Sequence, residues 1–350
     1  MLGMTLRDRF TATVDAIATR LIETFELRFT REVAHLASPV MRWLDFRRRH
    51  VEPMPRTAIA SDRFPLPLPP QAVVGLERLV AMFERGDDVN PYQGRGLRMR
   101  NDTSGGKRHA RTDLIYADWG ILHFHLPNGP IPPGRYFAPS SDWLAFCLIA
   151  DTQVAFIDVR PHGDRTAFAE PELLATALRS WPDFAERHRL KGISGEDAPD
   201  KGTIHALREG GVNRFFTHEG SVYAGPGGGV MTAGVPLHLV RLEDTVADFV
   251  DQVAAQVDDP SGYYRMYPTV RLVHEPVFDL RLHEEGLGLF EATSKTLFQA
   301  TSGPPSAQRS GMSGLSDLLV PPWALPSVRA AKARFDALWC EPAMPQADRT

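Results

Sequence analysis

The spacing of apolar residues along the chain predicts a helical N-terminal arm. From Thr5 to about Leu36, apolar side chains recur at steps of three and four with charged residues between them, which is typical of an amphipathic helix. A second, short helix is predicted over Met41–His50. The many prolines between Pro53 and Pro70 then predict an extended linker or wrapping arm. Residues 1–70 are therefore predicted to form a helical arm and linker.

Residues 71–185 show the alternation of polar and apolar positions that is typical of strands, framed by two helical patterns. The predicted elements, in order, are a helix at Gln71–Arg85 ended by Gly86, a strand or bent strand pair at Leu114–Leu126, a tight hairpin of the strands Trp143–Ala150 and Gln153–Arg160, and a covering helix at Pro171–Ser180. This segment is predicted to be a central antiparallel β-sheet domain flanked by helices.

The pattern starts afresh after Trp181, so residues 186–299 are predicted to form a second, small α/β domain. Its predicted elements are helices at Asp200–Glu209 and Thr245–Val257, a hairpin region at Val212–Leu242 and strand-like segments at Val270–Leu289. Residues 300–350 begin with a Ser-, Gly-, Pro- and Ala-rich stretch and lack periodicity, which predicts a loosely ordered tail. The fold class expected for the whole chain is α+β.

Composition narrows the class of protein. The hydrophobic fraction of 43% and the charged fraction of 23% are those of an ordinary globular protein. A net charge of −4 excludes a global nucleic-acid signature, so any contact with a polyanion must be local. The two cysteines, Cys147 and Cys340, cannot form a disulfide framework or a cysteine-based zinc site. We expect a cytoplasmic protein, since neither a signal peptide nor a membrane span is predicted.

The most informative motif is the pair His123 and His125. In a strand the two imidazoles share one face with Ile121, and such a pair can supply a general acid and a general base. A basic loop precedes the pair. It contains Arg95, Arg98, Arg100, Lys107, Arg108 and Arg111. Paired imidazoles beside concentrated positive charge suit a substrate that contains phosphate.

Four further residues are candidates for the same site. His162 ends the last predicted strand, and Arg135 lies in the loop before the hairpin. Trp119 and Tyr136 are aromatic side chains that could stack on bases. The arginine and lysine side chains of the loop, with these two rings, are the expected substrate-binding groups.

Simpler and competing interpretations stay open for these motifs. The two histidines could be a hydrogen-bonded pair on a half-exposed strand, with no chemistry. A metal site would need His162 or Asp158 as third ligand, but no recognised metal-ligand spacing is present, so neither a metal nor another cofactor is expected. The glycine-rich run Gly225–Gly229 lacks the features of a phosphate loop and is predicted to be a hairpin turn.

The order of these elements resembles the RelE/YoeB/YafQ/HigB group of toxin ribonucleases. The matching segments are Gly86–Pro91, the Arg/Lys loop, Ile121–Leu126, Ser141–Phe146 and Val154–His162. Where that group has a strand arginine, this chain has Asp142, or the arginine is displaced to Arg135. The resemblance implies metal-independent RNA cleavage, in which His123, His125 and His162 handle protons and Arg111 and Arg135 stabilise negative charge.

Three functions are therefore in view. The first is a toxin-like or defence-associated ribonuclease with histidine acid–base chemistry, which implies RNA and a neutralising protein as partners. The second is a non-catalytic module that binds a nucleotide, an RNA or a protein through the basic groove. The third is a metal-dependent enzyme that uses the histidine pair. No membrane partner is expected.

Overall fold

The computed structural model describes residues 4–99, 113–163, 166–196, 199–299 and 311–340. The fold is α+β with a helical N-terminus, as the sequence predicts. The chain divides into two compact units, which are described separately. The terminal unit comprises Met1–Phe29, His35–Asp45 and Arg241–Thr350, and the histidine unit comprises Thr30–Ala34 and Phe46–Val240.

These units differ from the linear division predicted at residues 70, 185 and 299, because the N-terminal helices pack with the C-terminal part of the chain. Arg9 Nη2 donates a hydrogen bond to the Phe278 carbonyl (3.3 Å), and Trp43 Nε1 donates one to the Leu319 carbonyl (2.8 Å). The amphipathic stripe of the first helix must be buried against another element. Its partner lies far along the chain, where a local pattern gives no information.

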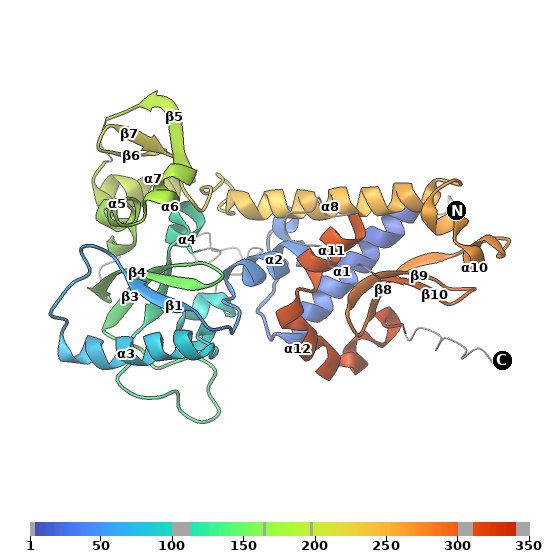
Figure 1. Ribbon diagram of the computed structural model, residues 1–350, viewed down its shortest axis with the longest axis horizontal. Helices are drawn as coiled ribbons and strands as arrows, with labels where there is room; N and C mark the ends of the chain where they lie inside the picture. The colour runs from blue at the N-terminus through green and yellow to red at the C-terminus, as the bar shows by residue number, and fades with distance from the viewer. Residues whose placement is uncertain (1–3, 100–112, 164–165, 197–198, 300–310, 341–350) are drawn as a thin grey trace. The chain divides into compact units, whose positions relative to one another are not determined.

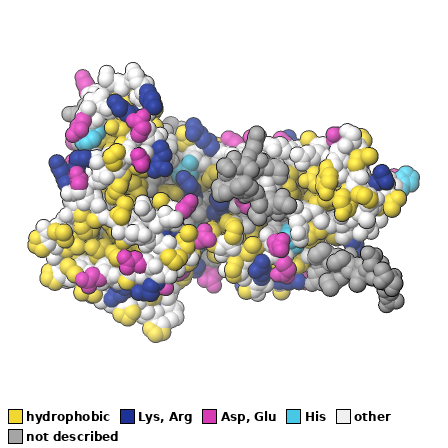
Figure 2. All heavy atoms as spheres, in the orientation of Figure 1, with side chains coloured by type: hydrophobic (Ala, Val, Ile, Leu, Met, Phe, Trp, Pro, Cys, Tyr) yellow, Lys and Arg dark blue, Asp and Glu magenta, His cyan; other side chains and the backbone are white. Residues whose placement is uncertain are grey.

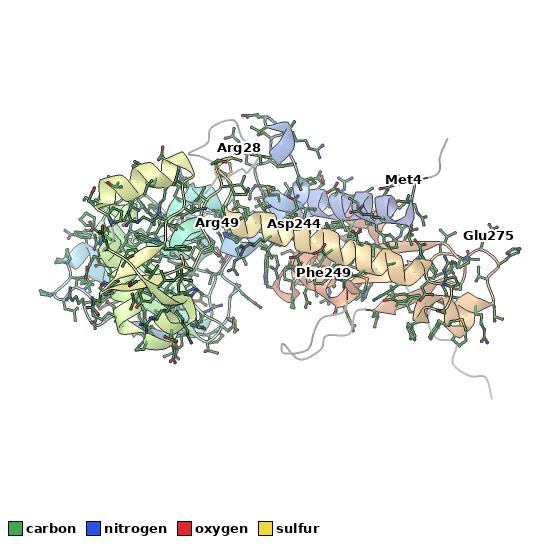
Figure 3. The ribbon with its side chains drawn as sticks, turned by 90° about the horizontal axis from the view of Figure 1, so that it is seen from above. Met4, Arg28, Arg49, Asp244, Phe249 and Glu275 are labelled. Carbon is green, nitrogen blue, oxygen red and sulfur yellow. The ribbon has the colours of Figure 1, made fainter. Side chains whose placement is uncertain are left out.

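In the terminal unit, α1 and α8 run side by side (Figures 1 and 3) and Arg7 forms an ion pair with Asp251 (2.5 Å). Thr5 caps α1 in a capping box with Asp8. The described helices are α1 (Leu6–Thr24), η1 (Ala34–Leu36), α2 (Pro39–Arg49), α8 (Leu237–Asp258), α9 (Tyr263–Met266) and α10 (Pro268–Arg271), and the antiparallel sheet has the order β10 (Thr296–Gln299), β9 (Gly286–Glu291), β8 (Phe278–His283). Both α2 and α8 also contribute residues to the histidine unit.

The prediction of a loosely ordered tail over 300–350 is wrong for the part that the structure describes. Residues 311–340 form α11 (Gly311–Leu319), η6 (Pro322–Ala324), α12 (Leu325–Ala330) and η7 (Lys332–Leu338). Leu315, Leu319, Val328 and Phe335 are completely buried. Short helices punctuated by glycine and proline show little periodicity in sequence, although each buries one or two large side chains.

The histidine unit is built on a four-stranded sheet with the order β1-β4-β3-β2. Its strands are β1 (Thr57–Ala60), β2 (Leu122–His125), β3 (Trp143–Ile149) and β4 (Gln153–Pro161). The β3–β4 hairpin is confirmed, with the Ala150 amide donating to the Gln153 carbonyl (2.9 Å) across the turn. β2 pairs antiparallel with β3, so β2 lies at one edge of the sheet and β1 at the other.

Helices cover both faces of this sheet (Figure 1). α3 (Pro70–Arg85) ends at Gly86 in the left-handed conformation (φ 77°) and packs Phe83 against Phe124 and Phe156. Cys147 is fully buried in the same core, as predicted. On the opposite face, α5 (Pro171–Ser180) buries Leu173 and Leu174 against Phe146. Helices α3 and α5 confirm the predicted helices at these positions.

Two segments before the sheet differ from their predictions. The proline-rich stretch 53–70 contains β1, which pairs in parallel with β4 and is therefore part of the sheet rather than a linker. Leu114–Trp119 is the helix α4, and only Leu122–His125 forms a strand. Asp113 caps the helix N-terminus, and Gly120 ends it in the left-handed conformation (φ 69°). These two caps permit a six-residue helix in a sequence that alternates as a strand does.

The glycine-rich run Gly225–Gly229 closes the end of α4. The Gly227 and Gly229 amides donate to the Asp118 and Ala117 carbonyls (both 2.9 Å). A Cβ atom at Gly227 would lie 2.2 Å from the Tyr116 carbonyl oxygen, so only glycine allows this approach. The run is thus not a hairpin turn: the hairpin of β6 (Phe216–His218) and β7 (Ser221–Tyr223) precedes it.

A second, three-stranded sheet and several short elements complete the histidine unit. β5 (Arg189–Ser194) pairs with β7 in a sheet of order β5-β7-β6. The helices beside it are α6 (Pro182–His188) and α7 (Lys201–Gly210), and three short 3-10 turns are η2 (Asn90–Tyr92), η3 (Arg95–Leu97) and η5 (Ala167–Ala169). Charged side chains of both signs are interspersed over the face of the molecule shown in Figure 2. Among the described residues, no extended positive surface covers that face, which is consistent with the net charge of −4.

We expect Gly75→Ala to lower the free energy of unfolding by about 1–3 kcal/mol, because the added methyl group overpacks the contact between α3 and the end of β2. A Cβ atom at Gly75 would lie 2.6 Å from Leu126 Cβ. Urea denaturation measures the effect. The matched control is Gly129→Ala, where a Cβ atom meets nothing within 4 Å. Equal stability of the two variants would contradict this account of the helix–strand contact.

Candidate functional site

The candidate site is centred on the edge strand β2. In the antiparallel pairing His123 lies opposite Phe146 and His125 opposite Leu144. Leu122 and Phe124 are buried in the core beneath α3, while both histidines are half-buried on the other face. Their ring centroids are 6.2 Å apart. The predicted sharing of one face by the two imidazoles is therefore confirmed.

His162 joins these two rings from the end of β4. Its backbone amide donates to the Asp142 carbonyl (2.7 Å), which continues the β3–β4 ladder by one residue. The exposed ring of His162 has its centroid 5.3 Å from that of His125. The two histidines of β2 and one from the end of β4 thus form one row, which we call the histidine row: His123, His125 and His162.

Asp113 stands at one end of the histidine row, and the sequence analysis did not single it out. Its Oδ2 lies 3.3 Å from His123 Nδ1, an ion-pair contact rather than a well-aligned hydrogen bond. Its Oδ1 accepts a hydrogen bond from the Tyr116 amide (3.3 Å) as the N-cap of α4. Burial alone would raise the pKa of Asp113, but the charges of His123 and Arg49 hold this pKa below its ordinary value.

Arg95 stands near the other histidine. Burial, the charges of His123 and His162, and the charge of Arg95 together lower the pKa of His125 to about 4. His125 is therefore a neutral imidazole at neutral pH. Its Nδ1 is buried and has no hydrogen-bond partner among the residues that the structure describes. A neutral imidazole has a lone pair that can accept a proton.

The space beside His123 is bounded by a glycine and a phenylalanine. A Cβ atom at Gly94 would lie 3.4 Å from His123 Nε2. The Phe168 ring, in η5, packs edge-on against His123 with centroids 5.0 Å apart. With Nδ1 turned to Asp113, Nε2 is the nitrogen of His123 that faces the glycine backbone.

The structure brings together only part of the predicted set of basic and aromatic residues. Arg98 stacks on the Tyr136 ring with its guanidinium carbon 3.4 Å from the centroid, and burial raises the pKa of Tyr136 to about 12. Arg135 is exposed on a turn in which its amide donates to the Pro132 carbonyl. Trp119 is buried against the Arg208 guanidinium. Arg100, Lys107, Arg108 and Arg111 lie outside the described residues.

The metal-dependent alternative needs a third ligand beside the histidine pair. Within the described ranges, no group of three or more His, Cys, Asp and Glu side chains is arranged to hold a metal ion. Asp158, the carboxylate considered as a third ligand, forms an ion pair with Arg160 (2.6 Å). The charge of Arg95, which lowers the pKa of His125, would also oppose a cation bound there.

Comparison of the chain with models of known protein families, with curated proteins and with solved structures gave no match. Among the described helices, none has both the length and the apolar character needed to cross a bilayer.

The neutral state of His125 predicts a pH-dependent stability. The folded pKa is about 4 against 6.5 for the unfolded chain. Below pH 6.5 the unfolded chain therefore binds more protons, and the free energy of unfolding falls as the pH falls from 6.5 towards 4. At about pH 5 this loss reaches up to about 2 kcal/mol relative to neutral pH.

His125→Gln removes this contribution. We expect urea denaturation of the variant to show a smaller fall in stability between neutral pH and about pH 5 than the wild type shows. His50, whose pKa burial also lowers to about 4, remains in both proteins and contributes the same fall to each. An identical pH dependence of the two proteins would show that His125 is not held neutral by the fold.

Proposed function

We propose that the histidine unit is the core of a metal-independent ribonuclease. The single observation that carries this proposal is the row of three imidazoles, with a carboxylate beside His123 and the charge of an arginine acting on His125. Cleavage of RNA by its own 2′-hydroxyl needs one group to remove a proton, one to deliver a proton and positive charge at the phosphate. The histidine row and its neighbours have these three components.

His125 is the proposed general base. Its neutral ring accepts the proton of the 2′-hydroxyl as that oxygen attacks the adjacent phosphorus atom. The Arg95 guanidinium offsets the negative charge that grows on the phosphoryl oxygens. The same guanidinium favours the neutral form of His125 before the substrate binds. One arginine thereby assists both the base and the transition state.

His123 is the proposed general acid. Asp113 gives an imidazolium at His123 an anionic partner and directs Nδ1 away from the substrate. Nε2 then delivers a proton to the 5′-oxygen as the P–O bond breaks, leaving a 2′,3′-cyclic phosphate and a 5′-hydroxyl. Rings 6.2 Å apart are compatible with acid and base groups on opposite sides of one phosphoryl group, each about 3 Å from its oxygen. The exposed His162 is the proposed contact for a phosphate oxygen.

The resemblance to the RelE/YoeB/YafQ/HigB group favours the same chemistry and extends it to a biological role. A ribonuclease of this type arrests growth by cutting cellular RNA, and a neutralising protein covers its basic surface. On this proposal the partners of the chain are single-stranded RNA and a protein inhibitor.

We expect His123→Asn and His125→Gln each to lower the rate of cleavage of a single-stranded RNA oligonucleotide about a hundredfold. A 2′-deoxy substitution at the cleaved linkage should abolish the reaction, because the nucleophile is then missing. His274→Gln, an exposed histidine of the terminal unit, is the matched control and should retain full activity. Exhaustive dialysis against a chelator should leave the wild-type rate unchanged.

The pH profile of kcat/KM gives a sharper test, because this quantity reports ionisations of the free enzyme. Its acidic limb should fall near pH 4, where His125 becomes protonated. A non-catalytic module that binds RNA through its basic residues predicts a different result: both histidine variants still bind RNA, and neither the variants nor the wild type produces a cyclic phosphate. Activity lost to a chelator and restored by one metal would contradict the proposal.

Gly94→Ala should lower the cleavage rate about tenfold or more, because the methyl group would stand 3.4 Å from His123 Nε2 and narrow the approach of the leaving oxygen. The backbone of Gly94 is in an ordinary conformation, so we expect the melting temperature to stay close to that of the wild type. Gly129→Ala serves as the control for glycine replacement. An unaltered cleavage rate in Gly94→Ala would show that His123 Nε2 does not deliver the proton to the leaving oxygen.

A further inference from the structure

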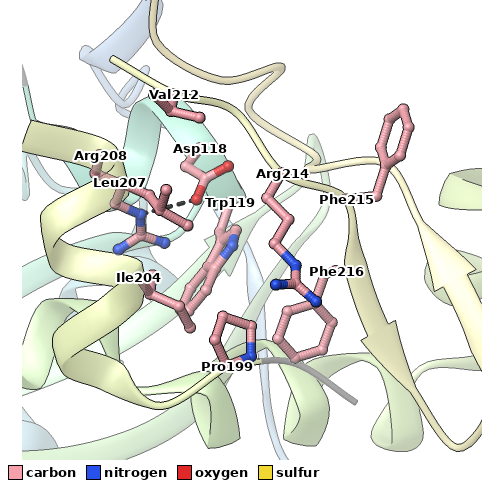
Figure 4. Close-up of a pocket in the computed structure, with 10 residues that line it drawn as sticks. All are labelled: Asp118, Trp119, Pro199, Ile204, Leu207, Arg208, Val212, Arg214, Phe215 and Phe216. Atoms are coloured by element: carbon pink, nitrogen blue, oxygen red, sulfur yellow. Dashed lines mark hydrogen bonds and ion pairs between the residues drawn. The ribbon is translucent and has the colours of Figure 1, made fainter. Parts of the chain in front are cut away.

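A buried arginine links the two segments that flank His123. Arg208, in α7, is only 5% exposed. Its Nε donates to Asp118 Oδ2 in α4 (2.8 Å), and its guanidinium carbon lies 4.0 Å from the centre of the Trp119 ring (Figure 4). Its Nη1 donates to the Phe168 carbonyl in η5 (2.6 Å). One side chain thus contacts both α4 and η5.

The first of these segments carries the carboxylate of the candidate site. α4 has six residues, with Asp113 as its N-cap and Asp118 in its last turn. A helix this short is not stable alone, so its position depends on contacts with other elements. The glycine-rich run holds the backbone of the last turn, and Arg208 holds its side chain. Because α4 moves as one unit, an anchor at Asp118 also fixes Asp113, whose Oδ2 lies 3.3 Å from His123 Nδ1.

The second segment supplies the ring that packs on His123. Phe168 lies in the three-residue turn η5, and its ring centroid is 5.0 Å from that of His123 and 5.7 Å from that of Phe146. The position of this ring depends on the backbone of η5, and Arg208 holds that backbone at the Phe168 carbonyl. The same guanidinium therefore fixes a carboxylate and an aromatic ring beside one imidazole.

The charges around Arg208 are coupled to the candidate site. Burial lowers the pKa of Arg208, whereas the carboxylates of Asp118 and Asp113 raise it. Burial raises the pKa of Asp118, and the charge and hydrogen bond of Arg208 oppose this rise. Without the guanidinium, the Asp118 carboxyl would be buried without a positive partner and would take up a proton. Loss of Arg208 would therefore alter the anchor of α4 and the charge that acts on Asp113.

We propose that Arg208 is a positioning residue that holds Asp113 and Phe168 in place beside His123. Its effect on catalysis rests on the proposed ribonuclease function, whereas its effect on the surroundings of His123 does not. Stability alone does not account for this arginine, because a buried ion pair contributes little compared with packed apolar side chains. Its Nη2 is also buried without a hydrogen-bond partner among the described residues, which costs free energy. The rigid fork of donors in a guanidinium is what allows contact with α4 and η5 at once.

The tautomer of the neutral His123 ring reports this geometry without any substrate. A carboxylate beside Nδ1 favours the hydrogen on Nδ1, and its withdrawal favours the hydrogen on Nε2, the tautomer preferred in water. Long-range proton–nitrogen NMR spectra at about pH 8.5, where an ordinary imidazole is neutral, distinguish the two forms. The His123→Asn spectrum identifies the signals of this ring. We expect the Nδ1–H form in the wild type and a shift towards the Nε2–H form in Arg208→Lys and Arg208→Met.

Two further variants separate positioning from general stability. Arg56 is the matched control, since it is a buried arginine of the same unit whose Nε and Nη1 donate to the Ala150 and Glu52 carbonyls. It precedes β1, at the opposite edge of the sheet from β2, so Arg56→Met should leave the His123 tautomer unchanged. The paired variant Asp118→Asn with Arg208→Gln leaves no buried charge alone and therefore keeps the fold. It should show the same tautomer shift as Arg208→Lys, and circular dichroism checks the folding of each protein.

Cleavage of RNA gives the second readout. Arg208→Lys should lower kcat about tenfold or more with little change in KM, because Arg95 and His162, which meet the phosphate in the proposed reaction, are untouched. A tautomer shift without cleavage by any protein would reject the ribonuclease and leave the positioning role standing. A His123 spectrum that is unchanged in folded Arg208 variants would overturn the inference, and so would an equal change in Arg56→Met.

Discussion

The antiparallel pairing of β2 with β3 is the constraint on which the candidate site depends. Because side chains alternate across a strand, the register that buries Leu122 and Phe124 also presents His123 and His125 on the opposite face. A slip of one residue would bury both imidazoles under α3 and expose the two apolar side chains. The free energy of core packing thus fixes the position of the histidines, with no dedicated polar contact needed to choose the face.

Electrostatics then makes the two strand histidines different from one another. A carboxylate contacts His123, whereas burial and three positive neighbours act on His125. The two side chains thereby lie in different electrostatic surroundings, and those of His125 lower its pKa. The proposed acid and base roles follow from this difference, and the Asp113 carboxylate and the Arg95 guanidinium are as important to it as the imidazoles.

The sequence predicts those features that arise from local patterns. The β3–β4 hairpin and the helix over Pro171–Ser180 were predicted because their periodicity and turn residues lie within about ten positions. Asp113 was missed because α4 was predicted as strand, although an aspartate followed by a glycine seven residues later can mark the two caps of a short helix. Arg208 was missed for another reason: its partner Asp118 is far away in the sequence, and no local pattern connects the two. The buried helices after residue 310 were missed because their apolar residues pack against α1 and α2, at the other end of the chain.

The clasp formed by Gly225–Gly229 on α4 has a consequence for the order of assembly during translation. Asp113, the N-cap of this helix, contacts His123. The last turn of the helix is held by the amides of Gly227 and Gly229, which are synthesised much later. A contact of such long sequence separation forms only after the intervening chain has been made and folded. The three histidines therefore leave the ribosome well before the clasp that secures the helix carrying their carboxylate. The proposed acid–base pair therefore stays incomplete until residues 225–229 have been made, when 121 of the 350 residues are still to follow.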